Sequence, residues 1–382
     1  MDINFIMAGS SMSGGDRVCA IYAKKLIERG HHVNVIAPKA ELLTFRQQLK
    51  RIIKGFGWKT VAEQLQNHFD LLGIKVTYLE SKRPVTSRDV PDADVIIATW
   101  WLTSEWINEF PESKGVKVHF VQGHENFKYL PIKRVTQVYR LPFYKITIAN
   151  WLVDILEQNY NAKHVSLVPN SVDLDTFFSV RREKQSIPTI GFLFSETECK
   201  GVAIALKVIE RLKLKILTLR VISFGMNKPQ TITLPDYIEL EVNPTQDKIR
   251  GIYEQCDVWL CCSLSEGFGL TILEAMACRT PAVSTKCGGP EDIISHGENG
   301  YLCDINDVNA LTESVFELLS LNEENWLKFS DKAYQHAISY TWDDAATLFE
   351  LALQKAVTLD NNSQSYTTSK NIRVNESLTK LV

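Results

Sequence analysis

The sequence predicts an α/β protein built from two Rossmann-like domains. The chain has 382 residues, which is longer than one ordinary domain. Apolar segments rich in β-branched residues alternate with segments whose apolar residues recur at helical spacing, and the whole alternation occurs twice. Strands that are separated by helices favour a parallel sheet covered on both faces, so we expect two such sheets.

The first half opens with a βαβ unit. A strand at 3–9 is followed by a Gly-rich turn and by a helix that ends at Gly30, after which the chain returns as a strand. The turn is not G-x-G-x-x-G, which argues against a dinucleotide-binding fingerprint. Later strands of this half are expected at 75–81, 93–100, 116–123 and 164–173, with another at ITIANW.

The second half follows a charged segment, 180–186, which has no apolar period and where we expect the connection between the domains. Strands and helices alternate again after it. The predicted organisation is a domain at 1–178, a domain at 179–341, an amphipathic helix at 342–358 and a polar, aperiodic tail at 359–382. We expect the tail to be mobile, because it has too few apolar residues to pack.

Composition and charge narrow the class of protein. A hydrophobic content of 45% and a charged content of 23% are typical of a soluble globular protein, and no apolar run is long enough for a membrane span. The N-terminus lacks the basic start and apolar run of a signal peptide, and the net charge of −3 gives no support to nucleic-acid binding. The eight cysteines include no C-x-x-C pair, which favours free thiols in a reducing cytosol over a zinc site.

The most informative segment is SEGFGLTILEAMACRTPAVST, at 265–285. Glu266 and Glu274 stand eight residues apart with a Gly-Phe-Gly turn between them. An apolar strand precedes them and a helix follows, so the unpaired N–H groups of that helix would lie beyond the carboxyl end of the strand, which suits a phosphate. One carboxylate could then reach a sugar and the other a ribose, as a nucleotide-sugar site needs. The alternative is a surface turn with two solvated glutamates.

This segment resembles the E-x7-E signature of family 4 (group 1) glycosyltransferases, because GFGL, EAMAC and TPAVST follow in the same order. The resemblance implies the GT-B fold, with two Rossmann-like domains facing each other across a cleft and a C-terminal helix returning to the first. It implies a retaining, metal-independent transfer from a nucleotide-diphosphate sugar to a saccharide or lipid-linked acceptor, in polysaccharide or glycolipid synthesis. The domain at 179–341 would bind the donor, and no cofactor is expected.

The same resemblance assigns roles to single residues. The candidate catalytic residues are Glu266 at the transferred sugar, Lys200 at the departing diphosphate, and His124 at the donor sugar. His124 is equally compatible with a loop histidine that has no such role. The expected donor-binding residues are Gly15, Gly201, Phe268, Gly269, Leu270 and Glu274, with Glu274 on the ribose hydroxyls.

Three residues depart from the family pattern. Phe192 stands where the family often has an arginine beside the diphosphate, so Lys200 is expected to be the main cation there. Asp16 replaces a small residue next to the Gly-Gly loop, where a carboxylate disfavours a diphosphate unless it faces away. Arg279 stands where a glycine usually ends the EAMAC helix.

One segment, 42–59, combines basic residues with aliphatic and aromatic ones. This combination suits an interfacial helix on an anionic membrane, which would place a cytoplasmic protein peripherally on the inner face of that membrane. A helix packed on the domain with solvated lysines fits the segment equally well.

Two other functions stay open. A GT-B epimerase or hydrolase would act on a nucleotide sugar without an acceptor. A non-catalytic sugar-nucleotide binding subunit would explain the missing arginine, but the presence of both Glu266 and Glu274 argues against it.

Overall fold

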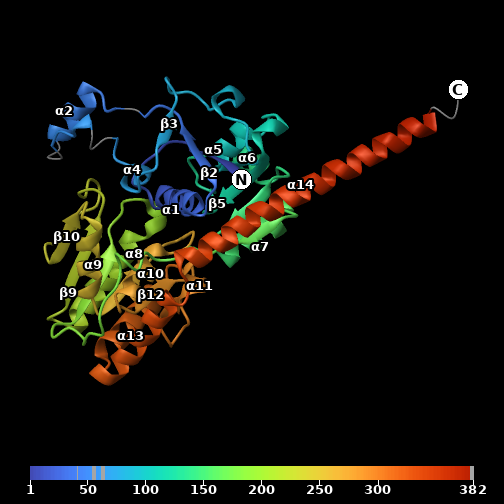
Figure 1. Ribbon diagram of the computed structural model, residues 1–382. Helices are drawn as coiled ribbons and strands as arrows, with labels where there is room; N and C mark the ends of the chain where they lie inside the picture. The colour runs from blue at the N-terminus through green and yellow to red at the C-terminus, as the bar shows by residue number, and fades with distance from the viewer. Residues whose placement is uncertain (41, 54–56, 62–64, 379–382) are drawn as a thin grey trace. The chain divides into compact units, whose positions relative to one another are not determined.

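The structure, a computed structural model, describes residues 1–40, 42–53, 57–61 and 65–378. The chain divides into two domains (Figure 1). The first domain comprises Met1–Thr147, Val153–Val168 and Ala346–Val382, and the second comprises Ile148–Leu152 and Pro169–Ala345. The predicted α/β class with two Rossmann-like domains is confirmed.

The first domain contains a seven-stranded parallel sheet in the order β3-β2-β1-β4-β5-β6-β7. The strands are β1 (Asp2–Ile6), β2 (His32–Ala37), β3 (Val76–Tyr78), β4 (Val95–Ala98), β5 (Val116–Val121), β6 (Tyr144–Thr147) and β7 (Val165–Leu167). The helices are α1 (Gly14–Glu28), α2 (Phe45–Ile53), α4 (His68–Leu71), α5 (Trp101–Ile107), α6 (Ile132–Tyr139) and α7 (Asn150–Tyr160). The central strands β1 and β4 are almost entirely buried because helices cover both of their faces.

The second domain contains a six-stranded parallel sheet in the order β10-β9-β8-β11-β12-β13. The strands are β8 (Thr189–Leu193), β9 (Arg220–Gly225), β10 (Ile238–Val242), β11 (Val258–Cys261), β12 (Ala282–Thr285) and β13 (Gly300–Cys303). The helices are α8 (Val202–Lys215), α9 (Gln246–Glu254), α10 (Leu270–Ala277), α11 (Pro290–Ile293), α12 (Val308–Ser320) and α13 (Glu323–Ile338).

Each sheet has one point where the strand order reverses direction. In the first domain the chain builds outward from β1 on one side and from β4 on the other, and in the second domain from β8 and from β11. In parallel sheets the loops that leave such a pair of strands diverge and open a crevice beyond their carboxyl ends. The fold therefore predicts one binding place on each domain.

The boundary between the domains lies at 168/169, ten residues before the predicted 178/179. The charged segment that we expected to connect the domains is packed on the second domain instead. The Arg182 guanidinium donates to the Thr280 hydroxyl at 2.8 Å and lies 4.9 Å from the centre of the Trp326 ring. The Lys184 ammonium donates to the carbonyl of Leu321 at 2.8 Å. Such tertiary contacts leave no trace in local periodicity, which explains the difference.

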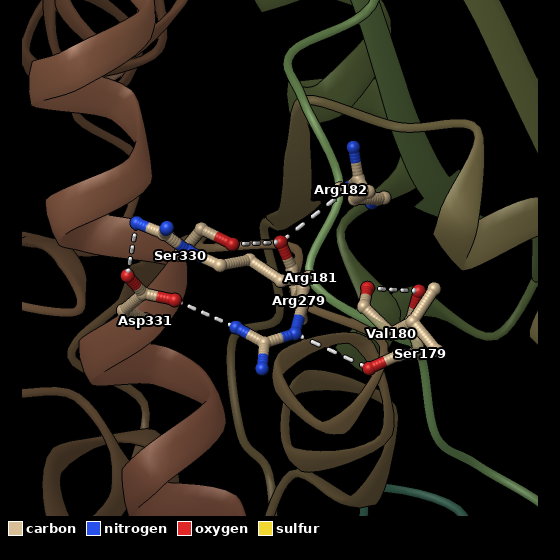
Figure 2. Close-up of polar contacts among 7 residues, drawn as sticks. All are labelled: Ser179, Val180, Arg181, Arg182, Arg279, Ser330 and Asp331. Atoms are coloured by element: carbon tan, nitrogen blue, oxygen red, sulfur yellow. Dashed lines mark hydrogen bonds and ion pairs between the residues drawn. The ribbon is translucent and has the colours of Figure 1, made fainter.

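Arg279 follows α10 with a φ of 62°, the left-handed conformation in which glycine is the usual residue. A side chain in this conformation costs about 1 kcal/mol. Figure 2 shows the contacts that offset this cost: the Arg279 guanidinium donates to Asp331 at 2.7 Å and to the carbonyl of Ser179 at 3.2 Å. The ring of Tyr334 lies 4.0 Å from it, and Arg181 binds the same Asp331 carboxylate.

The C-terminal helix, α14 (Trp342–Leu378), belongs to the first domain from Ala346 onward, so the predicted return of a C-terminal helix to that domain is confirmed. Its Phe349 is fully buried and stacks on Tyr22 at 4.2 Å between ring centres. The helix does not end at the predicted boundary of 358, because α14 continues to Leu378. No glycine or proline interrupts the helix over this stretch. The mobility of the segment stays a prediction.

Candidate active site

In the second domain, the loops after β8 and β11 bring two of the predicted catalytic residues together. The Lys200 ammonium lies 2.7 Å from Oε2 of Glu266, and both side chains are half-buried. The Ser263 hydroxyl donates to the same oxygen at 3.2 Å. Because these loops leave the two strands between which the order reverses, the ion pair sits at the place where the fold predicts a ligand.

Burial and the Glu266 carboxylate act on Lys200 in opposite directions. Burial disfavours the charged ammonium, but the neighbouring Glu266 carboxylate outweighs it and raises the pKa of Lys200 above its ordinary value. Lys200 is therefore a cation at neutral pH. A diphosphate that bound here would replace the carboxylate as its partner, which would release Glu266 to contact another group.

The position of Lys200 depends on the glycine that follows it. Gly201 has a φ of 63°, and a Cβ there would lie 1.8 Å from the carbonyl oxygen of Cys262. Only glycine lets the loop after β8 approach the end of β11 this closely. The N–H of Leu264 donates to the carbonyl of Cys199 at 2.7 Å, which joins the two loops directly.

The turn before α10 provides backbone donors beside the ion pair. Gly269 has a φ of 106° and precedes the first residue of the helix, Leu270. Among the described residues, nothing accepts a hydrogen bond from the N–H groups of Phe268, Gly269 or Leu270. Unpaired N–H groups at a helix N-terminus favour an anion, so these three predicted donor-binding residues have the chemistry that their role requires.

Glu274 lies inside α10, on the second turn. Its side chain is 4% exposed, and Oε2 accepts a hydrogen bond from the Tyr253 hydroxyl at 2.9 Å. A buried carboxylate needs such partners. The hydroxyl of Tyr253 therefore fixes the orientation of the carboxylate that was predicted to hold the ribose.

Sequence reasoning missed Trp151, which holds the Glu266 loop. Its indole N–H donates to the carbonyl of Gly267 at 3.0 Å. A Cβ on Gly288 would lie 2.5 Å from the same indole ring, so glycine is required where that loop passes it. The nearby Asn150 donates to Asp292 at 3.1 Å. The signal was present, since a polar residue and a tryptophan directly follow an apolar strand, but their partners lie more than 100 residues away.

The expectation that Phe192 occupies the place of a diphosphate-binding arginine stays a prediction. Gly191 lies in the interior of β8, where a Cβ would be 2.5 Å from the Cys256 sulfur. Phe192 is 1% exposed and belongs to the core of the domain, and it also lines a small cavity together with Lys200 and Glu266. From β8 to Gly201 the chain carries one cation, Lys200.

The loop that follows β8 carries a carboxylate that is already bound. Oε1 of Glu196 accepts hydrogen bonds from the N–H groups of Gln230, Thr231 and Ile232 at 2.6–2.9 Å. These bonds lower the pKa of Glu196 to about 2. Glu196 therefore anchors the loop after β9. As a carboxylate it cannot act as a cationic partner of a phosphate.

In the first domain, the loops after β1, β4 and β5 surround a cavity of about 460 Å³, at the strands where the sheet order reverses. We call it the first-domain cavity. It is lined by Ala8, Gly9, Ser10, Ser11, Ser13, Gly15, Asp16, Thr99, Trp100, Gln122, Gly123, Glu125 and Phe127. The predicted residue Gly15 therefore lies at a cavity, and so does Asp16.

Of the two polar residues that follow β5, the structure places Glu125 in the first-domain cavity. Glu125 is 8% exposed, and its Oε2 accepts the N–H of Trp101 at 3.0 Å. Burial raises the pKa of Glu125 to about 8. The ring of His124 instead lies 2.8 Å from the hydroxyl of Tyr160, and His124 is not among the residues that line the cavity.

Known proteins match this chain in sequence and in fold. Residues 184–321 match the family model described as glycosyl transferases group 1. The chain is 35% identical over 100 residues to D-inositol 3-phosphate glycosyltransferase of Corynebacterium urealyticum, a match that covers 26% of this chain and 23% of that protein. The sequence matches cover from 12% to 44% of the curated relatives' own length.

Two solved structures match nearly the whole chain. Sucrose-phosphate synthase from Thermosynechococcus elongatus has a TM-score of 0.68 at 14% identity, covering 94% of this chain and 100% of that one. HepE from Anabaena, in complex with UDP-glucose, has a TM-score of 0.67 at 13% identity, with coverages of 94% and 100%.

Proposed function

Because residues 184–321 match the family model of the group 1 glycosyl transferases and the fold is GT-B, we propose that the chain is a retaining glycosyltransferase. It moves a sugar from a nucleotide-diphosphate sugar to a hydroxyl group of an acceptor. One observation carries the proposal: the Lys200–Glu266 pair lies at the reversal point of the second sheet, beside the unpaired N–H groups of Phe268, Gly269 and Leu270.

In the proposed reaction, the second domain stabilises the leaving group. Lys200 and the N–H groups before α10 bind the diphosphate, whose negative charge grows as the bond to the anomeric carbon breaks. Glu266, once separated from Lys200, accepts hydrogen bonds from the transferred sugar. The acceptor hydroxyl attacks from the face that the diphosphate leaves, and its proton passes to the departing phosphate oxygen. Lys200 and the backbone supply the positive charge, so the reaction needs no divalent metal.

The nucleotide of the donor binds through its ribose to Glu274, whose carboxylate the Tyr253 hydroxyl orients. The similarity to HepE, which was solved with UDP-glucose, makes uridine diphosphate sugars the first donors to test. We place the protein in polysaccharide or glycolipid synthesis in the cytoplasm, with a saccharide or lipid-linked acceptor.

A peripheral contact with an anionic membrane is part of the proposal. In α2 and after it, Phe45, Leu49, Ile53 and Trp58 are between 45% and 76% exposed, and Lys50 is exposed among them. Exposed apolar groups next to basic ones suit the interface of an anionic bilayer. No helix within the described residues is long and apolar enough to span a membrane.

The segment has a defined shape, because the side chain of Gln48 joins α2 to the chain that follows it. Gln48 is buried, donates to the carbonyl of Lys59 at 2.7 Å and accepts its N–H at 3.1 Å. Near this clamp the ring centres of Phe45 and Trp58 lie 6.0 Å apart, so these two exposed aromatic groups are neighbours. Residues 54–56 of the predicted interfacial segment lie outside the described residues.

Calorimetry with a panel of nucleoside diphosphates and sugar nucleotides tests the donor, and NMR of the product tests the reaction. We expect a transferred sugar whose anomeric configuration is that of the donor, with undiminished activity in EDTA. Inversion of the anomeric centre would contradict the retaining mechanism. Release of free sugar or an epimer at the same rate with and without acceptor would favour the hydrolase or epimerase. Tight donor binding without turnover would favour the binding subunit.

A further inference from the structure

The first-domain cavity has the size and place of a substrate site. Its volume of about 460 Å³ lies within the range of about 300–1,000 Å³ that is usual for small-molecule sites. All the residues that line it belong to the first domain, and they come from the loops that leave β1, β4 and β5. A monosaccharide fits such a volume.

The uncharged groups in the first-domain cavity are those that recognise a polyhydroxylated molecule. Hydroxyl groups come from Ser10, Ser11, Ser13 and Thr99, and a carboxamide comes from Gln122. The rings of Trp100 and Phe127 supply apolar surface against which the C–H face of a sugar can pack. A few placed polar groups with aromatic walls are typical of a pocket that orients its ligand.

Both ionisable groups that line the cavity are acids, Asp16 and Glu125, and none of the lining residues is a lysine, arginine or histidine. Burial raises the pKa of Glu125 to about 8, so near neutral pH the negative charge in the cavity comes from Asp16. An anion that entered would lose its hydration without gaining an ion pair, which is costly. It would also approach the Asp16 carboxylate, and like charges placed together repel each other.

The N-terminus of α1, which could otherwise attract an anion, already carries a carboxylate in its first turn. The Ser13 hydroxyl accepts the N–H of Asp16 at 3.2 Å, and Ser11 donates to Oδ2 of Asp16 at 2.6 Å. Asp16 therefore stands in the first turn of the helix, where its carboxylate complements the positive end of the helix dipole. A second negative charge gains little there.

From this lining we propose that the first-domain cavity binds the acceptor, and that it selects acceptors whose bound ring is uncharged or carries an amine. Rings that carry a carboxylate or a phosphate are rejected. The inference rests on the proposed glycosyltransferase function and names the substrate class of its acceptor site.

Saturation-transfer NMR and calorimetry on the full chain test the inference with acceptor probes that differ in charge. The probes are methyl glucoside, methyl glucosaminide, methyl glucuronide and glucose 6-phosphate. We expect the first two to bind at least about tenfold more tightly than the last two. Equal or tighter binding of the glucuronide or the phosphate overturns the inference, and so does the absence of binding by both neutral and amino probes.

Variants of Asp16 sharpen the test. Asp16→Asn should reduce the difference in affinity between the neutral and anionic probes. Asp16→Lys should make glucose 6-phosphate bind more tightly than the neutral probe. Asp92→Asn is the matched control, since Asp92 is an exposed acid of the same domain that does not line the cavity. If the Asp16→Lys variant has wild-type thermal stability and the difference in affinity between neutral and anionic probes is unchanged, the inference is overturned.

The proposed function is tested separately, by binding and turnover of the nucleotide-sugar donor. If the donor is bound and its sugar transferred while anionic acceptors are preferred, only the acceptor inference fails. If no nucleotide sugar binds, the proposed function fails, whatever the probes show.

Discussion

Lys200 and Glu266 illustrate how an ion pair can hold two functional groups ready for a substrate. Their atoms are 2.7 Å apart in the structure, and each is the partner of the other. A half-buried ammonium without its carboxylate would lose its main source of stabilisation, so separation of the pair requires an anion in its place. A bound diphosphate supplies that anion and releases Glu266 to the sugar in the same event.

Lys200→Ala should lower turnover at least tenfold, and by about 10² if Lys200 acts like other single electrostatic donors to a transition state. The reason is that no other cation lies between β8 and Gly201. Steady-state kinetics with a saturating donor measures the effect, and Lys207→Ala, an exposed lysine of α8, is the matched control. Full activity in the Lys200 variant would remove it from the site.

Glu274→Ala should weaken donor binding by roughly 1.5–3 kcal/mol, because the ribose hydroxyls lose a charged acceptor. Tyr253→Phe keeps the carboxylate and removes the hydroxyl that orients it, so it should have a smaller effect in the same direction. Calorimetry with the nucleoside diphosphate measures both. A dissociation constant that Glu274→Ala leaves unchanged would exclude the ribose contact.

Among the helices, the two ends of α10 and the exposed side of α2 are the parts with a proposed function or an unusual conformation. The start of α10 offers unpaired donors to a ligand, whereas its end is fixed by Arg279 in place of glycine. The exposed side of α2 presents apolar groups that no described part of the chain covers. The first feature leads to a prediction about the stability of the second domain, and the second leads to one about membrane binding.

Arg279→Ala should destabilise the second domain more than Arg279→Gly does. Both substitutions remove the ion pair with Asp331, but alanine keeps the strained left-handed conformation, whereas glycine adopts it freely. We expect a difference of about 1 kcal/mol between the two variants in urea unfolding. Equal stabilities would show that the backbone at this position carries no strain.

The full chain should cosediment with anionic vesicles at low salt and dissociate as the salt concentration rises, because each basic residue near such a surface contributes about 1 kcal/mol. Phe45→Ser combined with Ile53→Ser should weaken binding at every salt concentration, and Arg46→Ser combined with Lys50→Ser should weaken it mainly at low salt. The control replaces Lys75 and Lys163, which are exposed elsewhere on the first domain. Vesicle binding that none of these variants reduces, or its absence at low salt, would contradict a membrane role for α2.

In the molecule as a whole, most of the fold followed from local patterns in the sequence, but the details that depend on distant contacts did not. The strands β1, β4, β8 and β11 come from mostly apolar segments that the sequence makes visible. The segments that follow β1, β8 and β11 hold Gly15, Lys200 and Glu266. The burial of Phe192 could not be predicted in this way, because it depends on packing in the core of the second domain.

Residues that act through distant partners were the ones that local patterns could not identify. Trp151 matters because Gly267 lies against it, and Glu125, not His124, faces the cavity because Trp101 and Tyr139 hold it there. The orientations of the Trp151 and Glu125 side chains therefore cannot be predicted from their neighbours in the sequence.

The stability of the whole protein should fall, relative to the variant Glu125→Gln, as pH rises from about 4.5 to about 8. The pKa of Glu125 is about 8 when folded, against an ordinary value of 4.5. Between these two pH values unfolding releases the proton of Glu125, so a rise in pH lowers the free energy of unfolding. Below about pH 4.5 the folded and unfolded states both hold the proton, and this group no longer makes the free energy of unfolding depend on pH. Urea unfolding across this pH range measures the difference, and Glu157→Gln, an exposed acid of α7, should follow the wild type. Parallel curves for the wild type and Glu125→Gln would contradict the raised pKa.

The return of α14 to the first domain sets an order in which the protein can be completed during its synthesis. A ribosome that has translated residue 345 has produced every residue of the second domain, but the first domain still lacks a helix. Until Phe349 emerges, the rings of Tyr22 and Phe120 have no partner at the position where it will stack. The domain that is begun first is therefore finished last, and its unfinished apolar surface is the part of the nascent chain most in need of protection from aggregation.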